Sequence, residues 1–348
     1  MKSSTALLFV LTLAVSSLAL AEDQIVIKFS HMAAPETPKG QAAERFKQLA
    51  EQNTGGRVKV EIYPSGQLYK DSDEFEALQS GAVQMLAPSL SRFAALGVRE
   101  FQLFDLPYIF PNSGVLHRVM DADVGRGLFK KLSAKGLTGL AYWDNGFKQM
   151  SSNRAMHKPT DLTRLKMCIQ PSKVLEAQMK AFAASPQVLP AGEIYTALQQ
   201  GTVDGAENPV SDFQAMKLQE VQKHLTISNH GYLGYAVVTN KKFWGDLPAD
   251  IRDILKQAMD EATHFERDLA QQENDAALAN LIATNTTEVH VLPPRERITW
   301  QMALLPVYQE FEDVIGKYLI KSVAYTAQQV LKEQNEANPK SKKSSAKR

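Results

Sequence analysis

The stretch 165–209 constrains the fold more than any other part of this sequence. Residues 165–170 alternate in polarity and predict a short strand, and a later helical pattern ends at Gly201. Glycine takes the left-handed conformation of a helix cap at little cost, so a second strand can start directly after it. A turn after that strand would present Glu207 and Asn208. Such strand ends place polar side chains at the carboxyl edge of an open α/β sheet, where such sheets bind ligands.

The opening of the chain has a strand–helix–strand pattern. Residues 25–31 and 58–63 are rich in β-branched side chains and predict strands, and residues 41–53 between them have helical apolar spacing. This order predicts parallel strands with a right-handed crossover. A much longer helical pattern covers residues 250–283, which predicts one brace across two lobes or two helices with a break near Gln271. The 348 residues suffice for two domains.

The N-terminus has the form of a secretory signal peptide. Lys2 is followed by an apolar run over residues 6–14, and the small residues of 19–21 predict cleavage after Ala21. An uncleaved membrane anchor is the alternative, but the apolar run is short and soon interrupted. Cys168 is the single cysteine, so an exported form has no internal disulfide. We expect an exported protein.

Composition and motifs argue against several classes of function. The formal net charge of +1 does not suggest a nucleic-acid binder. Nucleophile elbows, phosphate-binding loops and zinc-protease motifs are missing, and the seven histidines have no metal-ligand spacing. We therefore expect no enzyme, no cofactor and no metal. Residues 328–348 read as a basic disordered tail, with weak attraction to anionic membrane as the alternative.

A two-lobed α/β protein can close on a small ligand by hinge motion. At this point the sequence resembles the solute-binding proteins of tripartite ATP-independent periplasmic (TRAP) transporters, in particular the C4-dicarboxylate-binding DctP group. The similarity covers nearly the whole mature chain. Its most specific stretches are Ile27–His31, Pro64–Tyr69, Gln170–Gln178, Val203–Pro209 and Ser228–Tyr235.

The resemblance implies an α/β fold with two lobes, of the TRAP periplasmic-binding type, and a long helix that braces both. We expect lobe I to comprise residues 22–147 plus 236–270, and lobe II residues 148–235 plus 271–327. The resemblance further implies a location in the periplasm and closure on a small organic acid, which then passes to membrane permease subunits that use a sodium gradient. A sensor histidine kinase is an alternative partner. We expect a monomer.

Cys168 is the most informative departure from the family pattern. The family usually has an arginine at the matching position, which pairs with the ligand carboxylate. A thiol cannot replace a guanidinium fork, and losing one partner of a buried charged pair costs about 3–5 kcal/mol. Arg154, which matches a second family arginine, could take over; the ligand could differ; or binding could be weak. We favour retained organic-acid binding because Arg154 and Asn208 remain.

Other candidates each have a structural alternative. Lys39 suits the far carboxylate of a diacid, or is a solvated lysine. Ser89 could donate to the ligand or cap a helix, and Asn145 could be a simple turn residue. Tyr232 is a pocket-wall or hinge aromatic, with core packing as the alternative. The predicted ligand-binding set is Lys39, Ser89, Asn145, Arg154, Cys168, Gln170, Asn208 and Tyr232.

Overall fold

The structure is a computed structural model that describes residues 24–337. The predicted signal peptide, with its cleavage after Ala21, and residues 338–348 lie outside this part. The first elements are β1 (Ile25–Ser30), α1 (Pro38–Asn53) and β2 (Val58–Tyr63). The two strands pair in parallel, which confirms the predicted pattern. Helix α1 begins at Pro38, three residues before the predicted start at residue 41, because the Thr37 hydroxyl accepts a hydrogen bond from the Gly40 amide and Pro38 fits the first turn.

The strands of the described residues form one mixed sheet with the order β2-β1-β3-β8-β4-β7-β5-β6, and β9 pairs with β8. The side with β1–β3 and α1 is called lobe I here, and the side with β5–β7 and α7 lobe II. The remaining strands are β3 (Met85–Leu86), β4 (Leu137–Ser152), β5 (Lys166–Ile169), β6 (Ser185–Val188), β7 (Gly205–Asn208), β8 (His224–Asn240) and β9 (Glu288–Val291).

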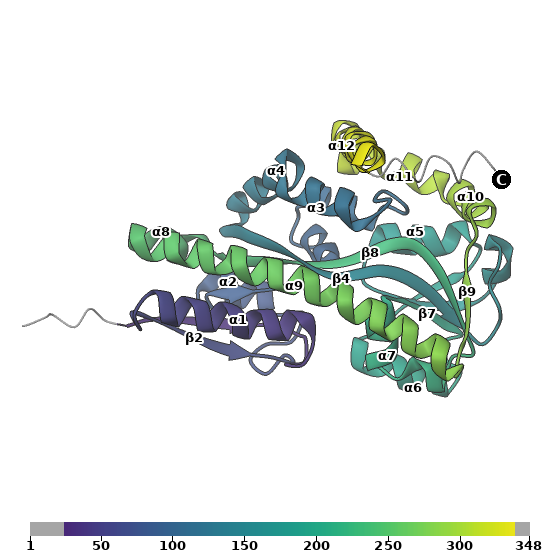
Figure 1. The fold of residues 1–348 in the computed structure, drawn as a ribbon, viewed down its shortest axis with the longest axis horizontal. Helices are drawn as coiled ribbons and strands as arrows, with labels where there is room; N and C mark the ends of the chain where they lie inside the picture. Colours follow the sequence, from purple (N-terminus) through teal and green to yellow (C-terminus); the bar gives the residue numbers. More distant parts are fainter. Residues whose placement is uncertain (1–23, 338–348) are drawn as a thin grey trace, which may run out of the picture.

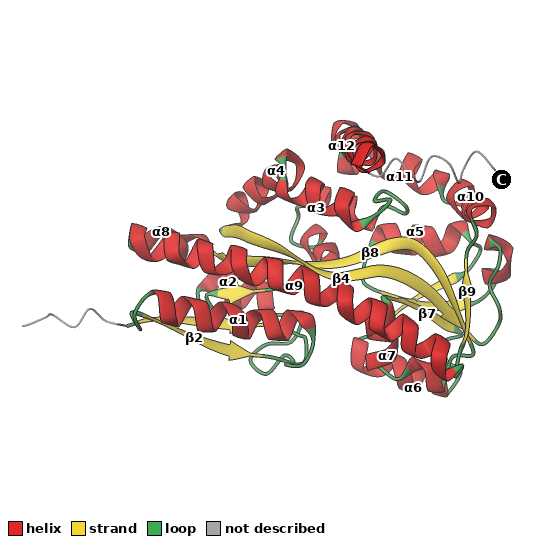
Figure 2. Cartoon of the chain, in the orientation of Figure 1, coloured by secondary structure: helices red, strands yellow, loops and turns green. Residues whose placement is uncertain are grey.

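Strands β4 and β8 run through both lobes, as Figure 2 shows. Their antiparallel pairing extends from Leu137 opposite Asn240 to Ser152 opposite His224. The alternative that Asn145 is a simple turn residue is therefore wrong, because β4 continues through it. The residues around Asn145 pair with β8 like the rest of β4. The pairing contains register shifts, one of them between Asp144 and Gly146. Glu207 and Asn208 likewise belong to β7 and not to a turn.

Helix α9 (Ala249–Thr284) is a single helix of 36 residues that crosses the whole molecule (Figure 1). This confirms the brace and rules out a break near Gln271. Its first half packs on α1 beside lobe I, where Ala258 and Ala262 are buried. Its second half packs on lobe II, where Leu281 joins an apolar cluster with Phe213. The small buried alanines allow the close approach of neighbouring elements.

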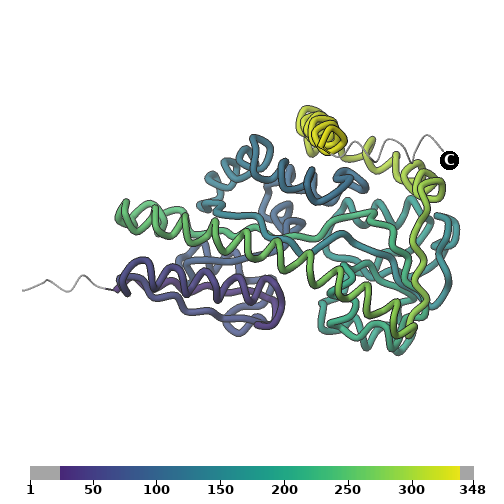
Figure 3. Tube along the Cα trace, viewed as in Figure 1, coloured from purple at the N-terminus to yellow at the C-terminus, as the bar shows by residue number. Residues whose placement is uncertain are grey.

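The other helices cover both sides of the sheet (Figure 2). The C-terminal helix α12 packs against α3, and Figure 3 shows it beside that part of the chain. It continues to Ala337, so residues 328–337, expected to be disordered, are helical. None of the helices within residues 24–337 is both long and apolar enough to cross a membrane. The bounds are α2 (Glu74–Ser80), α3 (Ser113–Asp121), α4 (Asp123–Leu132), α5 (Lys173–Ala181), α6 (Ile194–Gln199), α7 (Val210–Ala215), α8 (Lys241–Asp246), α10 (Pro294–Ala303), α11 (Leu305–Ile315) and α12 (Lys317–Ala337).

Candidate functional site

A polar cluster lies where lobe I, lobe II and the two long strands meet. Lys39 enters it from the first turn of α1 and is 5% exposed. Its Nζ donates to the Ala87 carbonyl at 3.3 Å and lies 3.5 Å from the centre of the Tyr235 ring. Burial lowers the pKa of Lys39 to about 8, against the charges of Glu74 and Asp212, which raise it. A buried ammonium is costly unless it is paired, so this position favours the binding of an anion.

Asn145 joins the two lobes through its side-chain amide. Its Nδ2 donates to the Tyr235 hydroxyl at 2.7 Å and to Oδ2 of Asp212 at 2.9 Å. Asp212 belongs to the first turn of α7, directly after the end of β7. Burial raises the pKa of Asp212 to about 6, while the Asn145 hydrogen bond and Lys39 oppose this. The four residues Lys39, Asn145, Asp212 and Tyr235 are called the interlobe cluster below.

Ser89 lies at the lobe I edge of this cluster. Its backbone bridges to Tyr235, and its hydroxyl lies 3.3 Å from the hydroxyl of Ser91. It precedes a short 3-10 helix, but its side chain makes no capping hydrogen bond there. Helix capping therefore does not explain this serine.

A fully buried charged group supports the lobe II side. Glu207 on β7 accepts from Nζ of Lys148 at 2.8 Å, and its other oxygen lies 3.0 Å from Nε2 of His230. The Ser228 hydroxyl lies 2.7 Å from Nδ1 of the same histidine. Burial raises the pKa of Glu207, but Lys148 and His230 outweigh it, and the net shift is downward. This network ties β4, β7 and β8 together.

Three predicted residues lie at or near the carboxyl ends of β5 and β7. Asn208 is 8% exposed, and its Oδ1 has no hydrogen-bond partner among the described residues. Gln170 follows β5 and is half-buried. Cys168 is 2% exposed and packs with Phe213 in the lobe II core. Burial raises the pKa of the Cys168 thiol to about 11, so this position supplies no charge.

Two predicted residues lie elsewhere. Arg154 follows β4, is exposed, and donates to the carbonyls of Asp161 and Thr163, which lie next to the start of β5, at the end opposite Gln170. Its guanidinium does not join the interlobe cluster. The Tyr232 hydroxyl donates to Oδ1 of Asp144 at 2.6 Å, and its ring is buried among aromatic side chains. Core packing, the alternative stated for Tyr232, describes its position.

Sequence reasoning missed Asp212, Lys148 and the pairing role of His230. Asp212 could have been found from the sequence, because it is an acidic residue that closely follows the predicted ligand-binding residue Asn208. Lys148 offered no signal in the sequence, because its partner Glu207 is far away in the chain.

One group within residues 24–337 brings three potential metal ligands together. The ligand atoms of His157, His290 and Glu296 lie within 4.8 Å of one another. They are exposed or half-buried, on the loop after β4, on β9 and at the start of α10. Arg295 and Arg297 flank Glu296 and add positive charge, which disfavours a cation. We assign no metal to this group.

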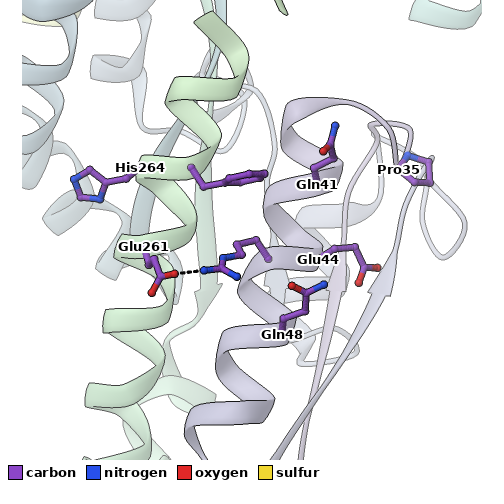
Figure 4. A pocket seen from close by; sticks show the side chains of 8 residues that line it. Pro35, Gln41, Glu44, Gln48, Glu261 and His264 are labelled. Carbon is purple, nitrogen blue, oxygen red and sulfur yellow. Dashed lines mark hydrogen bonds and ion pairs between the residues drawn. The ribbon is translucent and has the colours of Figure 1, made fainter. Parts of the chain in front are cut away.

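A surface hollow of about 600 Å³ lies between α1 and α9 (Figure 4). Arg45 of α1 pairs with Glu261 of α9 across it, and the ring of Phe265 forms part of its wall. None of the predicted ligand-binding residues lines this hollow. It is therefore separate from the interlobe cluster.

Two lobes joined by continuous strands, with a polar cluster between them, define the class of solute-binding proteins, which capture ligands without reaction. The chain belongs to the family of bacterial extracellular solute-binding proteins, family 7 (DctP), whose model matches residues 29–313. Members are substrate-binding proteins of transporters and not enzymes.

Individual relatives agree with this family. The chain is 55% identical to the C4-dicarboxylate-binding periplasmic protein DctP of Rhodobacter capsulatus, over 90% of this chain and 94% of that protein. A TRAP periplasmic solute-binding protein of Sulfurospirillum deleyianum, crystallised with succinate, has a TM-score of 0.81 and 44% identity, over 87% of this chain and 99% of that one. One of Pseudomonas aeruginosa, with bound L-malate, has a TM-score of 0.78 and 40% identity, over 82% and 99%.

Proposed function

We propose that this protein captures a small organic acid, similar in size to a C4-dicarboxylate, by closure of its lobes. The observation that carries this proposal is the buried ammonium of Lys39 in the interlobe cluster. A carboxylate beside this ammonium makes a charge-assisted hydrogen bond, which is among the stronger polar contacts in proteins. The ligands of the relatives, succinate and L-malate, are acids of this size.

The proposed cellular setting is supported by membership of the family. The mature chain, cleaved after Ala21, acts in the periplasm as a monomer and presents its closed form to the membrane permease of a TRAP transporter. A sensor histidine kinase that reads the same closed form is the alternative partner.

A binding protein of altered specificity is the second candidate. Cys168 favours it, because a neutral buried thiol stands where the resemblance implies an arginine. Arg154 does not compensate, since its guanidinium is engaged by two carbonyls at the other end of β5. A ligand with a second carboxylate therefore lacks a guanidinium partner on the lobe II side.

The test is a thermal-shift screen of the mature protein against dicarboxylates, keto acids and sugar acids, followed by calorimetry. We expect at least one acid to bind, and Lys39→Met to weaken it by about 100-fold or more, the equivalent of about 3 kcal/mol. Lys47→Met is the matched control, since Lys47 is half-buried on the same helix. The same screen on the Cys168→Arg variant shows which acids bind more tightly when a guanidinium is present at this position.

The proposal fails if no organic acid raises the melting temperature of the mature protein. It also fails if Lys39→Met and Lys47→Met change the affinity equally, because the ammonium would then not contact the ligand.

A further inference from the structure

The interlobe cluster contains both a cation and a carboxylate. Lys39 supplies the ammonium and Asp212 the carboxylate, and Asn145 connects Asp212 to the Tyr235 hydroxyl beneath that ammonium. Within residues 24–337, no lysine, arginine or histidine makes a direct ion pair with Asp212, and the charge of Lys39 acts on it from a greater distance. The acceptor capacity of its carboxylate exceeds the one amide hydrogen that it receives.

Other cations near this region are already neutralised or distant. Nζ of Lys148 is held by the buried Glu207 at 2.8 Å. The guanidinium of Arg154 is bound to backbone carbonyls beside the start of β5. Lys39 is thus the cation available to an incoming ligand in the described part of the site. The Lys39 ammonium can pair with one carboxylate of a ligand, and a second carboxylate has no cation left to pair with in this part of the site.

The lobe II side of the site offers acceptors instead. Asn208 ends β7, and Asp212 follows in the first turn of α7. Oδ1 of Asn208 is buried without a partner, which is costly unless a ligand donates to it. Rotating this amide would present donors instead, whereas the carboxylate of Asp212 can only accept.

We infer that the ligand is a monocarboxylate with a hydroxyl or ammonium group at its other end, oriented with its carboxylate on Lys39 and its donor on Asp212. A dicarboxylate would bring its second carboxylate toward Asp212, and like charges repel strongly in a partly buried site. This inference rests on the proposed function and names the substrate class of that same site. It makes Asp212 the specificity-determining residue.

Four ligands with the same four-carbon chain test it directly. Succinate, 4-hydroxybutyrate, 4-aminobutyrate and butyrate differ only at the carbon farthest from the shared carboxylate, which is a carboxylate, a hydroxymethyl, an ammoniomethyl or a methyl group. By calorimetry we expect the hydroxyl or the ammonium acid to bind the mature protein at least about tenfold more tightly than succinate and butyrate. In Asp212→Asn, which removes the charge and keeps the shape, we expect that advantage over succinate to fall by about tenfold or more.

Ser211→Ala is the matched control. Ser211 precedes Asp212, and its hydroxyl lies 3.4 Å from Oδ1 of Asn145, but it carries no charge. The order of affinities should survive this change. Circular dichroism and thermal unfolding of both variants establish that they are folded.

The outcomes separate the two proposals. If succinate binds most tightly and Asp212→Asn leaves the ratios unchanged, the inference about the substrate class is overturned and the proposed function stands. If none of the four binds while other acids of the screen do, the tightest diacid and the tightest donor-bearing monoacid are compared in the same way. If no organic acid binds at all, the proposed function itself fails.

Discussion

His31 follows β1 and is buried, with an exposure of 1%. Burial lowers the pKa of His31 to about 3, from 6.5, and the charge of Lys39 adds to this shift. Because the folded value is below the unfolded one, the unfolded chain binds a proton that the folded chain does not. The stability that neutral His31 contributes is present above pH 6.5 and is lost as the pH falls toward 3.

We therefore expect a loss of about 2–3 kcal/mol in unfolding free energy from this one group between pH 6.5 and about pH 4.5. Urea unfolding at both pH values measures it, and His31→Gln should show a smaller loss by about that amount. The exposed His264 provides the control variant His264→Gln. An unchanged pH dependence in His31→Gln would contradict this account.

At the residue scale, the sequence identified candidate residues best where their place at the end of a single helix or strand was enough to single them out. Lys39, Ser89 and Asn145 were predicted individually, and the structure brings all three to one place. Asp212 was missed because its importance comes from a contact between α7 and β4, two elements far apart in the chain. Whether these residues contact a ligand remains a prediction.

At the element scale, the register shift in β4 positions Asn145. Gly146 follows it, and a Cβ added there would lie 2.8 Å from Nδ2 of Asn274. This nitrogen belongs to α9 and donates to the Asn145 carbonyl at 2.7 Å. Gly146→Ala would push Asn274 away from that carbonyl and shift the Asn145 side chain.

We expect Gly146→Ala to lower the unfolding free energy by about 1–3 kcal/mol and to weaken acid binding. Thermal unfolding and calorimetry measure the two effects. Gly127→Ala on α4 is the control, because no atom outside its own helix lies within 4 Å of the added methyl group. That variant should be unchanged or up to about 1 kcal/mol more stable. Equal behaviour of the two variants would show that the α9 contact does not matter.

The local sequence pattern predicted individual helices and strands well, but it did not predict how far a strand continues when it pairs with a distant strand. The spacing of apolar residues identified α9 over nearly its full length, since one amphipathic period runs through it. The residues Asp144–Phe147 have turn chemistry, yet they continue β4 because pairing with β8 supplies partners for their backbone. That pairing is non-local, so a reading of β4 alone could not find it.

At the scale of the whole molecule, β4 and β8 are the connections through which the lobes can move relative to each other. Ligand binding that bridges Lys39 on α1 and Asp212 on α7 should bring the lobes together. We expect the radius of gyration in solution scattering to decrease when a saturating acid is added. Lys39→Met at the same acid concentration should show no decrease, and an unchanged radius of the native protein at saturation would exclude closure.

The continuous α9 has a mechanical consequence. With 36 residues it is about 54 Å long, and it is packed against lobe I at one end and lobe II at the other. Because α9 contacts both lobes, a bend of about 5° near its middle would displace one tip by about 2 Å relative to the other half of the helix. We expect closure on a ligand to bend α9 in this way, so that a partner protein in contact with the exposed face of α9 can distinguish the open from the closed form without touching the ligand.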